Sequence, residues 1–182
     1  MITEENLQDI FELADYLSKG DSEAYSLLRE AVFATDPEVT LDSLELVLEP
    51  AAFDAFLDLV GSSEKDNLWL ILLYLLEARG YLFIRDWKAS LADFSQGFDR
   101  LHTAKALGIS LLAGNIDLHR AGPIPIWCEH INAQLAASGH VLAGVDMNSE
   151  QYYLFLIESE KLPLIQELSG RLGYRIDLGQ NL

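Results

Sequence analysis

Residues suited to catalysis or metal binding are concentrated in one stretch of the chain, IPIWCEHINAQLAASGHVLAGVDMN, at residues 124–148. It contains Cys128, the only cysteine, together with His130, His140 and Asp146. A nucleophilic cysteine needs an imidazole nearby, and thiolate and imidazole are also the ligands that zinc prefers. Cys128-Glu129-His130 is therefore either a reactive site or the first part of an ordinary helix.

The spacing of these residues argues against a shared site. Side chains two apart on a helix diverge by about 200°, so Cys128 and His130 cannot converge on one metal ion or share a proton. A zinc site needs three or four ligands, and the chain has a single thiol. A nucleophilic Cys128 would need His102, His119 or His140 instead. Because Cys128 lies beside the apolar stripe of the predicted helix, we interpret it as a small buried hydrophobic residue.

The polar segment after this helix resembles a calcium loop only superficially. Asp146-Met147-Asn148-Ser149-Glu150 has oxygen donors at alternate positions, but Gln151 and Ile157 occupy the places where an EF-hand needs Gly and Glu. We interpret the segment as a hairpin turn, with a polar ligand or partner contact at its tip as the alternative. The common signatures of serine hydrolases, nucleotide-binding loops, zinc peptidases and Cys-x-x-Cys sites are absent. The sequence thus favours a protein without metal, cofactor or enzymatic activity.

The charge of the chain excludes several classes of partner. The sequence has 29 acidic and 12 basic residues, a formal net charge of −17. Residues 1–80 hold 18 of the acids and 4 of the bases, which leaves 11 acids and 8 bases for residues 81–182. Nucleic acids and anionic membrane surfaces bind clustered Lys and Arg, so we expect neither as a partner. The acidity either serves solubility or forms a face that binds a basic protein.

Length and hydropathy are those of a cytoplasmic globular protein. With 182 residues, half of them hydrophobic, the chain can form one domain or two small ones. The longest apolar run, residues 68–76, would rise only about 14 Å as a helix, less than half of a bilayer core. The first residues lack the features of a signal peptide, and a lone cysteine forms no intramolecular disulfide. We therefore expect a cytoplasmic location.

Apolar periodicity divides the chain at Gly80. The first part has the i, i+3, i+4 spacing of consecutive amphipathic helices, predicted at about residues 3–19, 21–36, 40–49, 50–60 and 63–79. The second part mixes strands at 81–84, 141–146, 151–157 and 174–178 with helices at 90–107, 126–137 and 159–172. Glycine and proline interrupt residues 108–125, which leaves at most short strands at 109–112 and 116–118.

The order of these elements predicts an α+β fold. The C-terminal part reads α-β-β-α-β, the order of an antiparallel sheet of three to five strands covered by helices. We expect an acidic all-helical region at residues 1–79 and an α+β region at 80–182, the helical bundle packing on the sheet as one compact body. Trp69, Trp87 and Trp127 are predicted core residues. The strand at 151–157 is apolar on both faces. It is therefore either a central strand or one whose outer face is covered by a helix or by a second subunit. The last alternative would make the protein a homodimer.

The second part of the chain also contains short motifs with a recognisable pattern. They are Trp127-Cys-Glu-His-Ile, Gly144-Val-Asp146, Tyr152-Tyr-Leu-Phe-Leu and Leu172-Gly-Tyr-Arg-Ile-Asp177, with Asp-Trp-Lys at 86–88 as a further landmark. In these residues the region from about 80 to 178 resembles an uncharacterised bacterial domain-of-unknown-function family. The resemblance implies an α+β fold in a bacterial cytoplasm, and it implies no activity and no catalytic residue.

Two functions are compatible with these observations. The favoured one is a non-enzymatic interaction protein that binds or neutralises a basic protein, as toxin-immunity proteins do. Its predicted partner-binding face is formed by acids of the third and fourth helices: Asp42, Glu45, Glu49, Asp54 and Asp58. The alternative is a small-molecule-binding protein or hydrolase, with a pocket between the helical half and the sheet near Trp87, His130 and Asp146.

Overall fold

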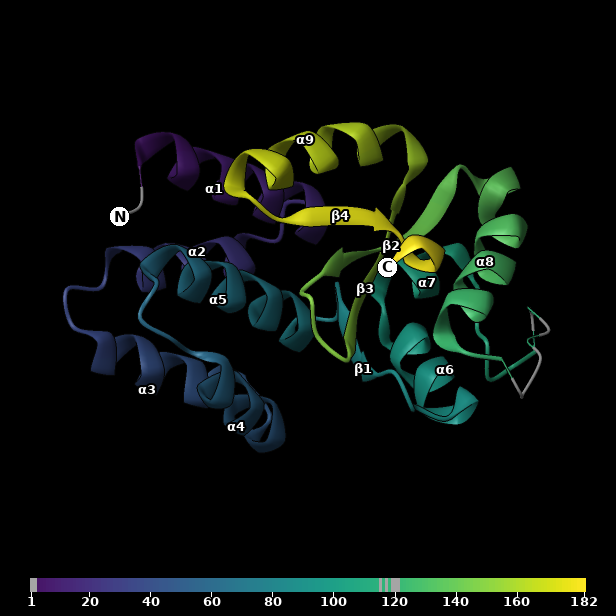
Figure 1. The fold of residues 1–182 in the computed structure, drawn as a ribbon, viewed down its shortest axis with the longest axis horizontal. Helices are drawn as coiled ribbons and strands as arrows, with labels where there is room; N and C mark the ends of the chain where they lie inside the picture. Colours follow the sequence, from purple (N-terminus) through teal and green to yellow (C-terminus); the bar gives the residue numbers. More distant parts are fainter. Residues whose placement is uncertain (1–2, 115, 117, 119–121) are drawn as a thin grey trace. The chain divides into compact units, whose positions relative to one another are not determined.

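The computed structural model describes residues 3–114, 116, 118 and 122–182. Helices precede a single four-stranded antiparallel sheet in the described residues, which confirms the predicted α+β fold (Figure 1). The chain divides into two compact units, Met1–Arg79 and Gly80–Leu182.

The first unit is built from helices, and the helices predicted for it are present. They are α1 (Glu4–Ser18), α2 (Ser22–Phe33), α3 (Pro37–Val47), α4 (Pro50–Leu59) and α5 (Glu64–Ala78). Short polar side chains begin four of them, because Thr3, Asp21, Asp36 and Ser63 each accept a hydrogen bond from a backbone N–H of the first turn. The helix expected from about Thr40 begins at Pro37, since Asp36 caps it and the fixed φ of proline suits a first turn.

The apolar helix α5 forms the centre of the first unit. Its residues Leu68–Leu76 are all buried, so it is covered on every side. Both α1 and α2 pack against it, and α4 contacts it as well (Figure 1). The surrounding helices turn one apolar stripe inward, with Ile10 and Leu13 of α1, Leu28 of α2 and Phe56 of α4 almost fully buried.

The second unit has the predicted α-β-β-α-β order in its C-terminal part. Its main elements are β1 (Phe83–Asp86), α6 (Leu91–Arg100), α7 (His102–Leu107), α8 (Ile124–Leu135), β2 (His140–Asp146), β3 (Gln151–Glu158), α9 (Leu162–Leu172) and β4 (Arg175–Leu178). The strand order is β1-β3-β2-β4 with antiparallel neighbours. β3 is therefore an interior strand, which is the first of the alternatives that its two apolar faces predicted.

Each face of this sheet carries its own apolar residues. On one face Leu142, Leu154 and Leu156 join a core with residues of α6 and α8, among them Phe94, Phe98, Trp127 and Ile131. The opposite face consists of Ala143, Val145, Tyr153, Phe155, Ile157 and Ile176, which are buried too. On that face α9 lies against β4, and Gln166 donates a hydrogen bond from Nε2 to the carbonyl oxygen of Ile176.

One expectation about the secondary structure of the second unit is wrong. The helix predicted over residues 90–107 is interrupted at Leu101, because the next amide, of His102, donates to the carbonyl of Gly80 at 2.9 Å. No strand forms at residues 109–112: residues 111–114 form a turn, and the carboxylate of Asp99 accepts the amides of Leu111 and Leu112. Ile116 and Leu118 are not in a strand either, and Asp117 between them lies outside the described residues.

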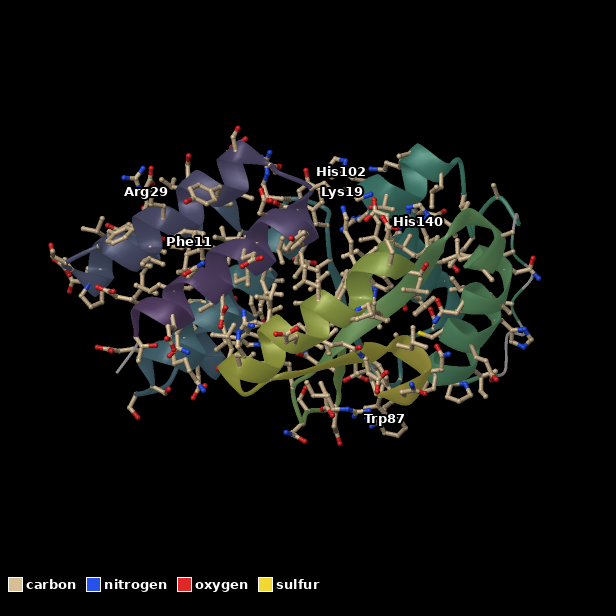
Figure 2. The ribbon with its side chains drawn as sticks, turned by 90° about the horizontal axis from the view of Figure 1, so that it is seen from above. Phe11, Lys19, Arg29, Trp87, His102 and His140 are labelled. Atoms are coloured by element: carbon tan, nitrogen blue, oxygen red, sulfur yellow. The ribbon has the colours of Figure 1, made fainter. Side chains whose placement is uncertain are left out.

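The expectation that Trp87 belongs to the core is also wrong. Its side chain is 49% exposed, whereas Trp69 and Trp127 are core residues as predicted. Trp87 follows the last residue of an edge strand, β1, and no strand among the described residues pairs with that edge. Figure 2 shows the indole at the periphery of the second unit. In the part of the chain that the structure describes, no helix is long and apolar enough to cross a membrane.

Stability should depend on the absence of a side chain at Gly144 in β2. A Cβ there would lie 2.5 Å from the carbonyl oxygen of Tyr153 and 2.9 Å from Cδ2 of Leu154. Gly144→Ala should therefore lower the free energy of unfolding by about 1–3 kcal/mol, as overpacking does. Gly170→Ala in α9 is the matched control, since its Cβ meets nothing within 4 Å and should stabilise the helix by up to about 1 kcal/mol. Urea denaturation measures both; equal effects of the two variants would contradict the prediction.

Candidate functional site

Cys128 belongs to the core of the second unit and has no exposed surface. Gly179 fits so closely against it that a Cβ added there would lie 2.8 Å from Sγ. Burial raises the pKa of the Cys128 thiol to about 12. Since the thiolate is the reactive form, the side chain is inert at neutral pH. The interpretation of Cys128 as a small buried hydrophobic residue is confirmed.

None of the described histidines is hydrogen-bonded to this thiol. His130 is exposed on α8, and His102 has its ring 5.0 Å from that of Tyr81. His140 begins β2, and its Nδ1 lies 2.8 Å from the carbonyl oxygen of Ser138. His119, the remaining candidate, lies outside the described residues. Within the described part of the chain, no group of three or more Cys, His, Asp or Glu side chains is placed to hold a metal ion.

A groove of about 360 Å³ lies beside the β2–β3 turn of the second unit, and we call it the Trp87 groove. Its lining consists of Trp87, Val145, Asp146, Met147, Ser149, Glu150, Gln151, Tyr152 and Leu182. It brings together Trp87 and Asp146, two of the three residues predicted for a pocket. His130 does not line it. His140 is also remote from it along the sheet, since it pairs with Glu158 at the opposite end of the hairpin (Figure 2).

The residues of the Trp87 groove are held by the hairpin turn that the sequence predicted. Asn148 has a φ of +49°, in the left-handed region, and its amide donates to Asp146 Oδ1 at 2.9 Å. The backbone N–H of Trp87 donates to the carbonyl of Glu150 at 2.9 Å, which ties the indole to the same turn. Lys88 places Nζ 4.8 Å from the centroid of that ring, within the range of a cation–π contact.

The second carboxylate oxygen of Asp146 takes part in an ion-pair network. It accepts from Arg175 Nη1 at 3.0 Å, and Nη2 of the same guanidinium donates to Asp177 at 2.8 Å. Burial opposes ionisation of Asp177, but hydrogen bonds from Asn181, Leu178 and Arg175 outweigh it and hold the pKa of Asp177 below its ordinary value. Burial, and then the nearby Cys128, raise the pKa of the Tyr152 phenol that lines the groove. Both carboxylate oxygens of Asp146 are thus engaged, one in the turn and one in the ion pair.

The five acids predicted as a partner-binding face are all exposed in the first unit. Asp42 and Glu45 lie on α3, Glu49 precedes α4, and Asp54 and Asp58 lie on α4. From residue 30 to residue 64 the sequence has nine acids and no Lys, Arg or His: Glu30, Asp36, Glu38, Asp42, Glu45, Glu49, Asp54, Asp58 and Glu64. Exposed apolar side chains lie between these acids in the sequence. They include Leu46, which is 88% exposed, Leu57 and Leu59. We call the five predicted acids the acidic face.

The first unit contains a groove that the sequence analysis did not predict. We call this groove, of about 350 Å³, the α2–α3 groove. It is lined by Leu27, Glu30, Ala31, Phe33, Ala34, Val39, Thr40, Ser43, Leu44 and Leu75. Phe33 and Val39 are 64% and 56% exposed. Phe33 lies one position beyond the apolar stripe of α2 that points toward α5. A large apolar residue outside the buried stripe was therefore the feature of the sequence that could have indicated this groove.

The fold and these surfaces define a small α+β protein with an acidic helical unit. The family model for DUF6630, described as a domain of unknown function, matches residues 9–179. The chain therefore belongs to this family, in agreement with the domain-of-unknown-function resemblance seen in residues 80–178. No curated protein and no solved structure matches the chain.

Burial of Cys128 should make stability fall at alkaline pH. In the unfolded chain the thiol loses its proton near its ordinary pKa of 9.0, but in the folded protein its pKa is about 12. Between these values the unfolded state binds fewer protons, so the free energy of unfolding decreases by up to about 1.4 kcal/mol per pH unit. Urea denaturation at about pH 8 and about pH 10 should show a larger loss for the wild type than for Cys128→Ala. Equal losses would mean that the thiol does not contribute.

Proposed function

We propose that this protein is a non-enzymatic interaction module that binds a basic protein through the acidic face of the first unit. In its most specific form the protein neutralises its partner, as an immunity protein does. The observation that carries the proposal is the combination of acids and exposed apolar side chains on α3 and α4 without any base between residues 30 and 64. Charge of one sign accelerates encounter with a partner of the opposite sign, and apolar contacts provide the lasting affinity.

A need for solubility does not explain why acids and exposed apolar side chains occur together on α3 and α4. Exposed acids keep a protein soluble wherever they lie, but the largest exposed apolar side chains of a soluble surface are usually scattered. Here Leu46 follows Glu45 directly, and Leu57 and Leu59 flank Asp58, so both kinds of side chain occupy the same helices. In an interface these leucines would supply apolar core contacts and the acids would form the polar rim.

Charge reversal on the acidic face should abolish capture of basic partners. The variant carries Lys at Asp42, Glu45, Glu49, Asp54 and Asp58, and its structure should persist because all five are exposed and Glu49 makes no side-chain cap bond. The immobilised wild type should retain basic proteins from a lysate at low salt, release them at high salt, and retain them far better than the variant does. Mass spectrometry identifies the retained proteins.

The location of the charge is tested separately from its amount. The triple variant Glu45→Lys, Asp54→Lys, Asp58→Lys is matched by Glu129→Lys, Glu160→Lys, Glu167→Lys on the second unit, because all six side chains are exposed. Only the first triple should lose capture. If both lose it equally, the partner responds to net charge alone; if neither does, or if the wild type retains no basic protein at low salt, the proposal is wrong.

The second candidate function is binding of a small polyhydroxylated molecule in the Trp87 groove. The observation in its favour is that a half-exposed indole shares this groove with carboxylate, amide and hydroxyl groups. An indole face covers the C–H groups of a sugar ring, and the few polar groups fix the orientation of its hydroxyls. Binding rather than hydrolysis is proposed for this groove, since Asp146 is bound to Arg175.

A thermal-shift panel of monosaccharides and polyols tests this second candidate. A ligand that binds only the folded protein raises its melting temperature, by several degrees at concentrations about 100-fold above its dissociation constant. Trp87→Ala should remove the shift, whereas Leu112→Ala, an exposed apolar residue of the same unit outside the groove, should keep it. A panel without any shift, or a shift that survives Trp87→Ala, would rule out the groove as this site.

A further inference from the structure

We propose that the α2–α3 groove receives the apolar side of a basic amphipathic helix from the partner protein. This inference rests on the proposed function, because it names the segment that an acidic interaction module would hold. The groove is separate from the acidic face in its residues: none of Asp42, Glu45, Glu49, Asp54 and Asp58 lines it. It therefore adds an apolar anchor point to an electrostatic surface.

The groove has a buried floor and exposed apolar walls. Leu44 of α3 and Leu75 of α5 are almost fully buried and form its base, while Phe33 and Val39 rise from either side of the turn between α2 and α3. A phenylalanine left mostly in water loses the free energy that its burial would provide. An apolar side chain placed between Phe33 and Val39 would bury both of them.

The lining residues recur at helical spacing on each side. On α2 they are Leu27, Glu30 and Ala31, followed by the C-cap residue Ala34, and on α3 they are Val39, Thr40, Ser43 and Leu44. The hydroxyl of Ser43 donates to the carbonyl of Val39 at 2.9 Å, so this polar group is already satisfied within α3. A groove between two helices, lined by small and apolar residues, accepts a third helix that presents apolar residues at every third or fourth position.

The charge at the rim selects a basic segment. Glu30 lines the groove, and Asp36 and Glu38 lie at the turn that joins its two walls. The C-terminus of α2 at Phe33 and the N-terminus of α3 at Pro37 meet at this turn with dipole ends of opposite sign, so the acids set the charge of the rim. Arg29 is the one base of α2, but it does not line the groove, and its side chain extends into solvent (Figure 2). Lys and Arg flanking the apolar residues of a ligand helix match this rim.

The groove keeps its shape in the free protein because both of its walls are anchored. Asp21 caps α2 and also binds Arg79 at the end of α5, with Oδ2 2.9 Å from Nη2. Asp36 caps α3 by accepting the amide of Glu38 at 3.0 Å. A preformed groove loses little conformational entropy when a ligand binds.

The probe is a synthetic amphipathic peptide of about 18 residues with Leu at helical spacing and Lys elsewhere, labelled for fluorescence anisotropy. At low salt it should bind the wild-type protein, and Phe33→Ser and Val39→Ser should each weaken binding about tenfold. The matched control is Leu112→Ser, which removes an apolar side chain of similar exposure, 61% against 64% for Phe33, from the second unit and should leave affinity unchanged. A peptide with Gln in place of Lys should bind much more weakly.

The outcomes separate this inference from the proposed function. If Phe33→Ser and Val39→Ser bind the peptide as the wild type does, or if no peptide binds, the groove inference is overturned, while capture of basic proteins that depends on the acidic face would still stand. If the Gln peptide binds equally well, the groove holds apolar ligands without regard to charge and the basic segment is wrong. If sedimentation finds a homodimer that Phe33→Ser dissociates, the occupant is a second copy and the inference fails.

Discussion

The first unit depends on one carboxylate, that of Asp21. Its Oδ1 accepts the amides of Glu23 and Ala24 and begins α2, while its Oδ2 binds the guanidinium of Arg79 at the end of α5. Arg79 also contacts Glu23 at 2.7 Å, so two acids near the start of α2 share one of the four bases found in residues 1–80. This ion pair links α2, which bears one wall of the α2–α3 groove, to α5, which supplies Leu75 to its floor. Because α5 is the apolar centre of the unit, the bond holds α2 in place against that centre. Removal of the carboxylate would lose a cap and an ion pair together.

In the second unit close packing has the corresponding role, and it removes the Cys128 thiol from contact with solvent. Cys128 faces Gly179, where even a methyl group would not fit. Four positions further along α8, Asn132 accepts the amide of Leu142 through Oδ1 at 2.6 Å and donates to its carbonyl through Nδ2 at 3.0 Å. The side chain thus replaces a strand partner for β2 and locks the helix to the sheet. Within residues 124–148 the thiol and Asn132 thus serve packing, whereas the turn after Asp146 is accessible and lines the Trp87 groove.

Most helices and strands could be predicted from local sequence patterns. The features that could not be predicted depend on tertiary contacts. Apolar spacing and capping residues located the helices of the first unit, and the Asp146–Glu150 turn located the β2–β3 hairpin. The break at Leu101 could not be predicted, because it follows from a hydrogen bond between His102 and Gly80, which are far apart in sequence. The same holds for the surfaces. Exposure of the acidic face followed from helix periodicity, but the α2–α3 groove required the packing of three helices, and Trp87 was misplaced because an aromatic residue after a strand is usually core.

The acidity and the exposed apolar residues of the first unit are two unfavourable features of the free protein that a single class of ligand would relieve. Nine acids without a base over residues 30–64 repel one another, and the repulsion is reduced when cations come near. Phe33 and Val39 are exposed to water, although they lie beside the buried apolar residues Leu44 and Leu75 of the same groove. A neutral apolar ligand would relieve only the second feature, and a counterion only the first. A segment that carries both apolar and basic side chains relieves both, which is the physical reason to assign it to this unit.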